Sequence, residues 1–420
     1  MELFNNKFSL AHPDTTRGPV FDESSDNIFI ESISNASEQH RKEIYDIYFG
    51  GMFYHRDFSY GDVMGATPTP GQYKNLLEIQ EKFGIPISVT FNEMRRPIEI
   101  MKPKNIQAFC DRIQDYYDDG VRSCTISHTH LMRCGALQER FPEMSWKNTV
   151  NHRIRSTQEM VDYAKLGYNV IQLDRDFNRN LAELKKSRVE ADRLGIKTCL
   201  LVTEQCMPEC PFKVEHDMWQ SGPELRSHDA SYWDVFKDTC VHWRDFGYNR
   251  NGNFGSIQNP RFGTDLTLMS KSTWEQFAMN CDTFKFSGRL MDITRNVPER
   301  CYTIEIIDDD TPIVPGTTDS DYIAAGKRKI LKIPDLKTAW DNNLEPIGLW
   351  PQIAMAADFP YTEIIEDMDE IREYLKEHFW NSDVGKDLEK TLRTCRNQCY
   401  QCHKCDRAFG IGDIDSIIEV

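Results

Sequence analysis

Short apolar runs alternate with longer stretches of helical spacing between residues 27 and 289, and this alternation constrains the fold more than any other feature. It is the pattern of repeated strand-helix units around a parallel sheet. Several runs follow a glycine of the kind that ends a helix, such as Gly84, Gly120 and Gly195. The eight expected strands are 28–33, 44–49, 85–91, 123–127, 146–151, 168–173, 196–203 and 283–286.

Eight such units favour an α/β fold of the closed (β/α)8 type, a TIM-like barrel, over an open doubly wound sheet. A doubly wound sheet would carry a glycine-rich nucleotide turn after its first strand, and none is present. The chain also lacks the GxxxxGK[ST], GxSxG and HExxH motifs, so phosphate-loop, esterase and zinc-protease chemistry have no support.

The length of 420 residues suits a large barrel with an extension, because a domain averages about 150 residues. We expect an N-terminal arm at 1–25 and a barrel with a cysteine-bearing loop at 26–311. A linker and a C-terminal helical, cysteine-rich extension would occupy 312–420. The linker is rich in Pro, Thr and Asp at 312–321, and a charged amphipathic helix is expected near 363–379.

The formal net charge of −16 repels phosphate backbones and anionic membrane surfaces. We therefore expect no extended duplex nucleic acid as a partner. No window of about 18 uncharged apolar residues occurs, and the N-terminus lacks a signal-peptide pattern. The expectation is a soluble, cytoplasmic protein without a membrane partner.

Thirteen cysteines are an unusual number for a chain with this expected location. Four of them form a terminal CxxxCxxCxxC group, which comprises Cys395, Cys399, Cys402 and Cys405. Thiols in a reducing compartment are more often metal ligands than disulfides. Close crowding is typical of iron-sulfur clusters, whereas zinc sites usually split their ligands into two separated pairs. An iron-sulfur cluster, zinc and unligated thiols remain the three interpretations, in that order.

A second group begins where the seventh expected strand ends. Cys206 and Cys210 follow that strand, and Cys240 lies on the same long loop. Active sites of such barrels are built on the loops that leave the C-terminal ends of the strands. A cluster with one open iron is a possible reading here, and structural thiols are the alternative. The remaining cysteines lie in apolar or helical stretches and are expected to be small buried hydrophobic residues: Cys110, Cys124, Cys134, Cys199 and Cys301.

Polar side chains follow several of the expected strands and would face one mouth of the barrel. They are Asn92, Glu93, His128, His130, Asn151, Asp174, Arg175, Glu204, Lys285 and Arg289. Together they supply acids, bases and anion clamps for a polar or anionic substrate. His128 and Arg175 are the favoured members, because histidine shuttles protons near neutral pH and arginine binds carboxylates in bidentate fashion. We expect the catalytic groups to be His128, Asp174, Arg175 and Glu204. A layer-filling or salt-bridging role is the alternative for each.

Over residues 26 to 300 the chain resembles the collagenase-like peptidase family U-32. The matching features occur in the order of that family: 46–51 (DIYFGG) with Arg56, Asn92, Asn151, 173–175 (LDR), Cys206 with Cys210, and 284–289 (FKFSGR). Many members of that family look like iron-sulfur proteins of oxygen-independent hydroxylation of RNA or ubiquinone. The resemblance implies a 4Fe-4S cluster at Cys206, Cys210 and Cys240, with Cys281 as a fourth ligand.

The sequence thus leads to the expectation of an iron-sulfur-dependent oxidoreductase that hydroxylates or otherwise modifies a small molecule or a single nucleotide. One or two 4Fe-4S clusters would be the cofactors, with zinc as the alternative at the terminal cysteines, and an electron donor protein is a possible partner. Two other functions stay open: a non-catalytic electron-transfer or zinc-stabilised scaffold protein, and a peptidase. A peptidase would need a nucleophile or hydrolytic metal site, and the sequence offers none of the familiar ones.

Overall fold

A computed structural model of the chain describes residues 7–12, 33–34, 38–62, 67–202, 213–220, 271–285, 303–306, 329–332, 381–395, 398–402 and 404. Eight parallel strands form a closed barrel in the order β1-β10-β9-β8-β7-β6-β5-β2. Their bounds are β1 Lys7–Ala11, β2 Ile44–Gly50, β5 Ile87–Phe91, β6 Ser123–Ile126, β7 Ser145–Lys147, β8 Val170–Gln172, β9 Lys197–Leu201 and β10 Thr283–Lys285. The expected (β/α)8 barrel is confirmed.

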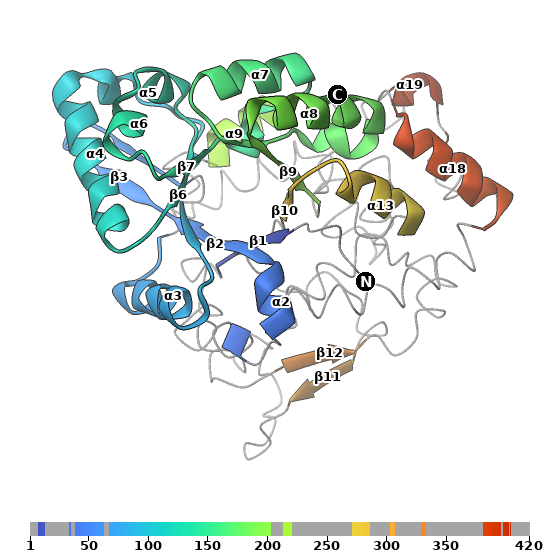
Figure 1. The fold of residues 1–420 in the computed structure, drawn as a ribbon, viewed down its shortest axis with the longest axis horizontal. Coiled ribbons are helices and arrows are strands. Elements are labelled where there is room, and N and C mark those ends of the chain that lie inside the picture. The colour runs from blue at the N-terminus through green and yellow to red at the C-terminus, as the bar shows by residue number, and fades with distance from the viewer. Residues whose placement is uncertain are drawn as a thin grey trace.

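Helices separate the strands and lie around the barrel (Figure 1). The α-helices of the barrel region are α2 Glu38–Glu43, α3 Pro70–Phe83, α4 Pro103–Asp118, α5 Thr129–Arg133, α6 Ala136–Arg140, α7 Thr157–Lys165, α8 Leu181–Leu194, α9 Lys213–Gln220 and α13 Lys271–Ala278. Three 3-10 turns, η2 Ile98–Met101, η3 Val150–His152 and η4 Arg175–Arg179, follow β5, β7 and β8. A hairpin of β3 Met52–Tyr54 and β4 Ser59–Gly61 follows β2.

The sequence marks the helix ends as expected. Thr69 caps α3 through a capping box, since its hydroxyl accepts from the Gln72 N–H while the Gln72 side chain accepts from the Thr69 N–H. Gly84 ends the same helix with φ of 67°, in the left-handed region that a residue with a Cβ avoids. Helix α8 ends in the same way at Gly195. The glycines that the sequence places between a helix and the next strand therefore do end these two helices.

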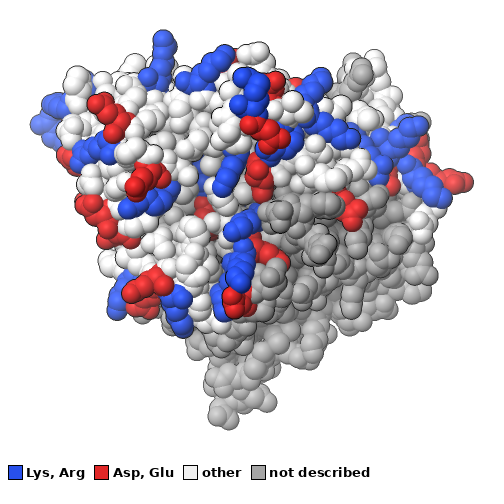
Figure 2. Space-filling view, in the orientation of Figure 1, with Lys and Arg blue, Asp and Glu red and all other residues white. Residues whose placement is uncertain are grey.

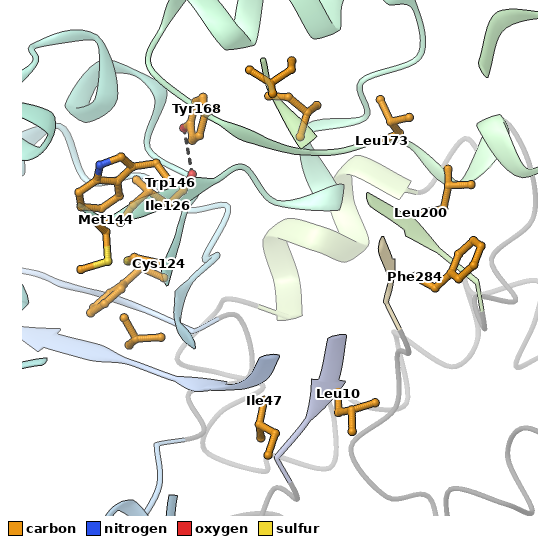
Figure 3. Packing of buried hydrophobic residues seen from close by; sticks show 14 of the residues in the cluster. Leu10, Ile47, Cys124, Ile126, Met144, Trp146, Tyr168, Leu173, Leu200 and Phe284 are labelled. Atoms are coloured by element: carbon orange, nitrogen blue, oxygen red, sulfur yellow. Dashed lines mark hydrogen bonds between the residues drawn. The ribbon is translucent and has the colours of Figure 1, made fainter. Parts of the chain in front are cut away.

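Apolar side chains of the strands point outward, where the helices cover them. Figure 3 shows ten labelled members of this layer, which is continuous from Leu10 and Ile47 to Leu200 and Phe284. The Tyr168 hydroxyl within it donates to the Ile126 carbonyl oxygen at 2.9 Å, so its one polar atom is satisfied. The hydrophobic core of this protein therefore lies between the barrel and its helices.

The first strand of the barrel is not the one expected. β1 spans Lys7–Ala11, inside the segment assigned to an N-terminal arm, and closes the barrel between β2 and β10. The barrel thus begins at Lys7 and not at residue 26. Most of the expected strand 28–33 lies outside the described residues, and Ile33 is helical. Only Phe8 and Leu10 signal β1, too short an alternation to compete with the stronger apolar run at 28–33. The other seven expected strands overlap β2 and β5 to β10.

The C-terminal extension is packed on the barrel. Helix α18, Asp383–Arg393, lies beside α8 and α13 in Figure 1, and the short helix α19, Cys399–Cys402, follows it. The Arg393 guanidinium and the Glu389 carboxylate both bond the Thr273 hydroxyl of α13, and Leu388 and Leu392 are buried. Thr394 forms an antiparallel bridge with Asn180, directly after η4. The extension is therefore held at a specific place on the barrel.

Two further strands, β11 Thr303–Ile306 and β12 Lys329–Lys332, form an antiparallel pair. They pair across the domain boundary expected at residue 311. The linker 312–321 and the helix expected near 363–379 lie outside the described residues. Among the described helices, none combines the length and the apolar character needed to cross a membrane.

We predict that Leu10→Ala lowers the free energy of unfolding by about 2–5 kcal/mol, because it deletes a fully buried side chain on the strand that closes the barrel. Val189→Ala, at an exposed position of α8, is the matched control and should change it by less than about 0.5 kcal/mol. Urea unfolding followed by circular dichroism measures both. Equal, small effects of the two changes would show that β1 does not belong to the barrel.

Candidate functional site

The interior of the barrel is polar. TIM barrels usually fill this space with branched apolar side chains. Here the positions that alternate with the outward-facing apolar residues carry hydroxyls, charges and an amide, and most of them are buried. They include Ser9, Asp46, Ser88, Thr90, Ser123, Thr125, Lys147, Gln172, Thr283 and Lys285. Because burying such groups gains little stability, this interior points to a binding or catalytic role.

An ion pair crosses the interior. The Lys147 ammonium on β7 bonds the Asp46 carboxylate on β2, and these strands are not neighbours in the barrel, so the contact runs through the lumen. Ser9 donates to the same carboxylate at 2.6 Å, and the Ser88 hydroxyl lies 3.4 Å from the ammonium nitrogen. The side chains of Lys147 and Asp46 are only 6% and 1% exposed. Desolvating two charges is costly, and these additional hydrogen bonds offset part of that cost.

A second polar connection lies near the other side of the lumen. The Lys285 ammonium on β10 donates to the Gln172 side-chain oxygen on β8 at 3.2 Å, and it lies 4.1 Å from the centre of the Tyr48 ring. The Asn148 side-chain oxygen accepts from the Gln172 backbone N–H at 2.6 Å, and the Gln172 side-chain nitrogen donates to the Asn148 carbonyl oxygen at 2.5 Å. These hydrogen bonds hold the Gln172 amide between the end of β7 and the lysine of β10.

A pocket of about 280 Å³, counting its open mouth, lies between these groups. It is lined by Ser9, Tyr45, Tyr48, Thr125, Lys147, Val170, Gln172, Cys199, Thr283 and Lys285. Cys199 is buried, as expected, yet it faces this pocket and not the apolar layer. Burial raises the pKa of its thiol, so the group enters the pocket uncharged. Hydrogen-bonding groups from several strands converge on this pocket, whose enclosed space has room for no more than about one water molecule.

The loops after β7 and β8 bring three of the expected site residues together. An Nη of Arg175 donates to the Asn151 Oδ1 at 3.3 Å. The Asp174 carboxylate accepts from the Asp176 N–H at 2.9 Å and lies 4.0 Å from the Arg153 Nε. Among the described residues, Arg153 is the single non-glycine residue with a positive φ, at 56°. Strained backbone of this kind concentrates at functional sites.

His128 has a structural role at the end of β6. Its Nδ1 accepts from the Leu131 N–H at 3.3 Å, which caps α5, and its Nε2 lies 3.3 Å from the Pro97 carbonyl oxygen. A carbonyl only accepts, so Nε2 carries the proton and both ring nitrogens are engaged. Burial lowers the pKa of His128 to about 4. The contacts of its ring among the described residues do not include Asp174 or Arg175. The structure thus favours the capping role over proton transfer.

Other strand-end residues hold the mouth together. Glu93, buried after β5, accepts from the Gly61 N–H at 3.2 Å and so fixes the β3–β4 hairpin. The Tyr60 hydroxyl of this hairpin donates to the Phe91 carbonyl oxygen and accepts from the N–H of His128. Asn92 lies directly after β5, and His130 lies on the exposed side of α5. These residues shape the rim of the barrel.

The expected mouth cluster lies mostly outside the described residues, as do Glu204, Cys206, Cys210, Cys240 and Arg289. Cys281 is described, and it precedes β10 at the end of the barrel opposite to the mouth. Its side chain belongs to the apolar layer, and burial raises the pKa of its thiol well above the usual value. The described position of Cys281 therefore does not suit a thiolate ligand.

The other cysteines divide into buried and accessible ones. Cys110 and Cys124 are buried in the apolar layer as expected, whereas Cys134 is exposed. Cys301 and Cys405 lie outside the described residues, as does the side chain of Cys399. Cys395 and Cys402 are half-buried on the docked extension. Within the described part of the chain no three metal-ligating side chains come together.

Sequence reasoning missed the lumen. Lys147 lies within an expected strand, between Trp146 and Asn148, and Gln172 lies between Ile171 and Leu173. A polar residue flanked by buried neighbours in a strand faces the side opposite to the core. The alternation of these polar residues with apolar neighbours could have predicted that Lys147 and Gln172 face the inside of the barrel. The cross-lumen partner of each residue was not available, because it depends on the closed order of strands.

Comparisons with known proteins find likenesses among solved structures alone. No protein-family model matches the chain, and no curated protein matches it. Among solved structures, the U32 peptidase Mk0906 is similar over 67% of this chain and 93% of its own, with 13% identity and a TM-score of 0.40. The expected likeness to the U-32 family thus recurs among solved structures.

Two aldolases are also similar to the chain. A deoxyribose phosphate aldolase from Aeropyrum pernix is 11% identical over 52% of this chain and 82% of its own, with a TM-score of 0.28. An HpcH/HpaI aldolase from Desulfitobacterium hafniense DCB-2 is 11% identical over 56% and 94%, with a TM-score of 0.26. At these identities the likenesses do not identify an activity, and the chemistry must be argued from the chain's own residues.

We predict that Lys147→Met lowers the free energy of unfolding by about 3–5 kcal/mol, because it leaves the Asp46 carboxylate buried without its counter-charge. The double change with Asp46→Asn should recover much of this loss, since no charge is then buried. Urea unfolding of both single variants and the double variant measures the coupling. Additive effects of the two changes would contradict a direct ion pair.

We predict that His128 makes the protein sensitive to acid. Its folded pKa of about 4 lies below the unfolded value of about 6.5, so the unfolded chain binds the proton first. The contribution of neutral His128 to the free energy of unfolding is complete above about pH 6.5. It falls by up to about 3 kcal/mol as the pH decreases to about 4. His128→Asn keeps a capping side chain without this titration. A steeper loss of stability in the variant than in the wild type over this range would refute the assignment.

Proposed function

We propose that this chain is a barrel enzyme that converts a small polar molecule in its lumen and uses a thiolate-bound iron-sulfur centre as its redox group. The observation that carries the proposal is the joint placement of two features. The lumen is lined by charges and hydroxyls, and the terminal thiol segment docks on η4, the turn that leaves β8 at the mouth. Oxygen-independent hydroxylation, the chemistry suggested by the U-32 resemblance, is the finer form of the proposal.

The lumen supports a small substrate with carbonyl, hydroxyl or carboxylate oxygens. Lys285 is a suitable donor to such an oxygen, because it lines the pocket and donates to Gln172, a neutral amide that a substrate oxygen can replace. The Lys147–Asp46 pair keeps a fixed dipole beside this position. Preorganised charges in a site that excludes water stabilise charge that develops during a reaction.

The terminal cysteines suit a soft metal centre. Four thiols occur within residues 395–405, and thiolates select iron-sulfur clusters or zinc. Two of the four side chains are described, and both are half-buried on a segment that is anchored to the barrel through Thr394. A cluster bound there would relay electrons for the barrel reaction, and in a hydroxylation it would accept the two electrons that the substrate loses. The protein's own part is to hold the thiolates beside η4 and to limit the access of water to them.

The proposed substrate is an individual small molecule or a single nucleotide, not a long duplex. Duplex affinity rests on many contacts from Lys and Arg to phosphates, and the net charge of the chain is −16. In the face of the molecule shown in Figure 2, the described positive and negative side chains are interspersed. The arginines at the loops after β7 and β8 would suit one anionic group on the substrate.

We predict that anaerobically purified protein is brown, absorbs broadly near about 400 nm and contains both iron and acid-labile sulfide. The double change Cys395→Ser and Cys402→Ser should abolish or sharply reduce this content, whereas Cys110→Ser, in the apolar layer, should leave it in any protein that folds. Iron and sulfide analysis with zinc determination measures the outcome. Stoichiometric zinc without sulfide would replace the redox proposal with a zinc-stabilised scaffold.

A further inference from the structure

A substrate of this barrel would lie mostly at its mouth. The enclosed space of the pocket in the lumen has room for about one water molecule. The groups that line it can therefore contact only one small part of a larger molecule. The rest of that molecule would lie on the loops that follow the strands, where barrels of this type bind their substrates.

The segments at the mouth are positively charged, in contrast to the chain as a whole. Those that follow β5, β6, β7 and β8 are residues 92–102, 127–135, 148–156 and 173–180. They hold eight Lys or Arg and four Asp or Glu, whereas the chain has a formal net charge of −16. A region of one charge sign raises the local concentration of ligands of the opposite sign. The mouth therefore favours an anionic ligand.

The loops after β7 and β8 are held together by contacts that cross between them. The Asp174 N–H donates to the Ile154 carbonyl oxygen at 2.9 Å. An Nη of Arg175, a residue that is 8% exposed, donates to the Asn151 Oδ1 at 3.3 Å. The Arg153 Nε lies 4.0 Å from the Asp174 carboxylate. Arg153, which lies between Asn151 and Ile154 in the chain, is therefore held at a defined place beside Asp174.

The guanidinium of Arg153 is held in place without being used in hydrogen bonds. Its 4.0 Å contact with Asp174 is too long for one, and no described residue accepts a hydrogen bond from its side chain. The Asp174 carboxylate accepts instead from the Asp176 N–H, at 2.9 Å. The Arg153 side chain is 24% exposed, so a ligand can reach it. Its N–H donors are thus available to an oxyanion.

The backbone of Arg153 also favours a role in binding. The residue follows η3 with φ of 56° and ψ of 51°, a left-handed conformation that a Cβ disfavours. Glycine serves at the comparable positions after α3 and α8, at Gly84 and Gly195. An arginine in this conformation costs stability that a glycine would not, and proteins accept such costs mainly at functional sites.

A second guanidinium, that of Arg96, comes from the loop after β5. Arg96 is exposed, and it forms no ion pair or hydrogen bond with a described residue. The carbonyl oxygen of Pro97, the next residue, lies 3.3 Å from the His128 Nε2. His152 in turn bonds the Ser127 carbonyl oxygen at 2.7 Å. Burial lowers the pKa of both histidines, and the positive charge of Arg96 adds to this effect. Arg96 therefore lies near both rings, and both rings are neutral at pH 7.

We propose that Arg153 and Arg96 form an oxyanion site at the mouth of the barrel, which binds a carboxylate or phosphate group of the substrate. His152, the ring near Arg96, directly precedes Arg153 in the chain, so the two arginines belong to the same side of the mouth. The inference rests on the proposed small substrate and names its anionic group. Guanidinium groups bind both kinds of oxyanion through paired N–H donors. Asp174 and Arg175 are positioning residues, because they hold the loop of Arg153.

Isothermal titration calorimetry of the full-length protein with inorganic phosphate and, separately, with succinate tests the site. At low ionic strength, where charges are screened least, at least one probe should bind with a stoichiometry of one per chain. Arg153→Gln should weaken this binding by about tenfold or more, and Arg96→Gln by about threefold to tenfold. Arg193→Gln, at an exposed arginine of α8 paired with Glu190, removes the same charge and should leave the affinity unchanged.

Arg153→Gly separates binding from folding. Glycine adopts the left-handed conformation without strain, so this variant should keep or raise the melting temperature of the wild type. It should nevertheless lose the binding as Arg153→Gln does. Circular dichroism measures the melting temperature. A value well below that of the wild type would assign Arg153 a structural role and contradict the inference.

The two probes also distinguish the kinds of oxyanion. Binding of phosphate alone would assign a phosphate group to the substrate, and binding of succinate alone a carboxylate, and either result supports the site. Wild-type protein that binds neither probe would overturn it. Equal affinities in the wild type and Arg153→Gln, or in the wild type and Arg96→Gln, would also overturn the site as proposed.

Failure of this inference is distinguishable from failure of the redox proposal, because the titration needs no turnover. A protein that contains an iron-sulfur centre and binds neither probe would overturn the oxyanion site alone. A protein that binds a probe through Arg153 and contains no iron would overturn the redox proposal and leave the oxyanion site standing.

Discussion

The ion pair between Lys147 and Asp46 spans the barrel and sets the character of everything inside it. Once two charges occupy the lumen, the neighbouring inward positions must supply hydrogen bonds, and Ser9 and Ser88 do so. The inside of the barrel then cannot stabilise the fold by burying apolar side chains. Stability must come from the layer between strands and helices, which is where the apolar side chains lie.

This division of labour explains which parts of the fold the sequence predicted well. Outward-facing residues such as Val89, Ile171 and Leu200 follow the period of a strand and mark it directly. Glycines with positive φ, such as Gly84 and Gly195, mark the helix ends in the same local way. β1 escaped notice because its identity comes from pairing with β2 and β10, which are distant in the sequence.

The candidate site was less predictable, and the reason is again physical. The type of a residue at a strand end indicates which reactions its side chain can take part in. It does not indicate which of its atoms already form hydrogen bonds within the protein. His128 has the right chemistry and position, yet its two nitrogens cap α5 and bond Pro97. Cys199 was interpreted as an inert thiol, and the closed barrel turns it toward the pocket. Lys147 could be placed on a strand, but Asp46, its partner, is about 100 residues away.

The bridge between Asn180 and Thr394 also has a consequence for how the molecule is made. The two residues are separated by about 200 positions, and a ribosome adds about 5–20 residues per second. The turn that carries Arg179 therefore leaves the ribosome about 10–40 seconds before the segment that docks against it. The extension can dock on η4 only after this part of the barrel has been synthesised, so the Asn180–Thr394 bridge forms in a late step of assembly.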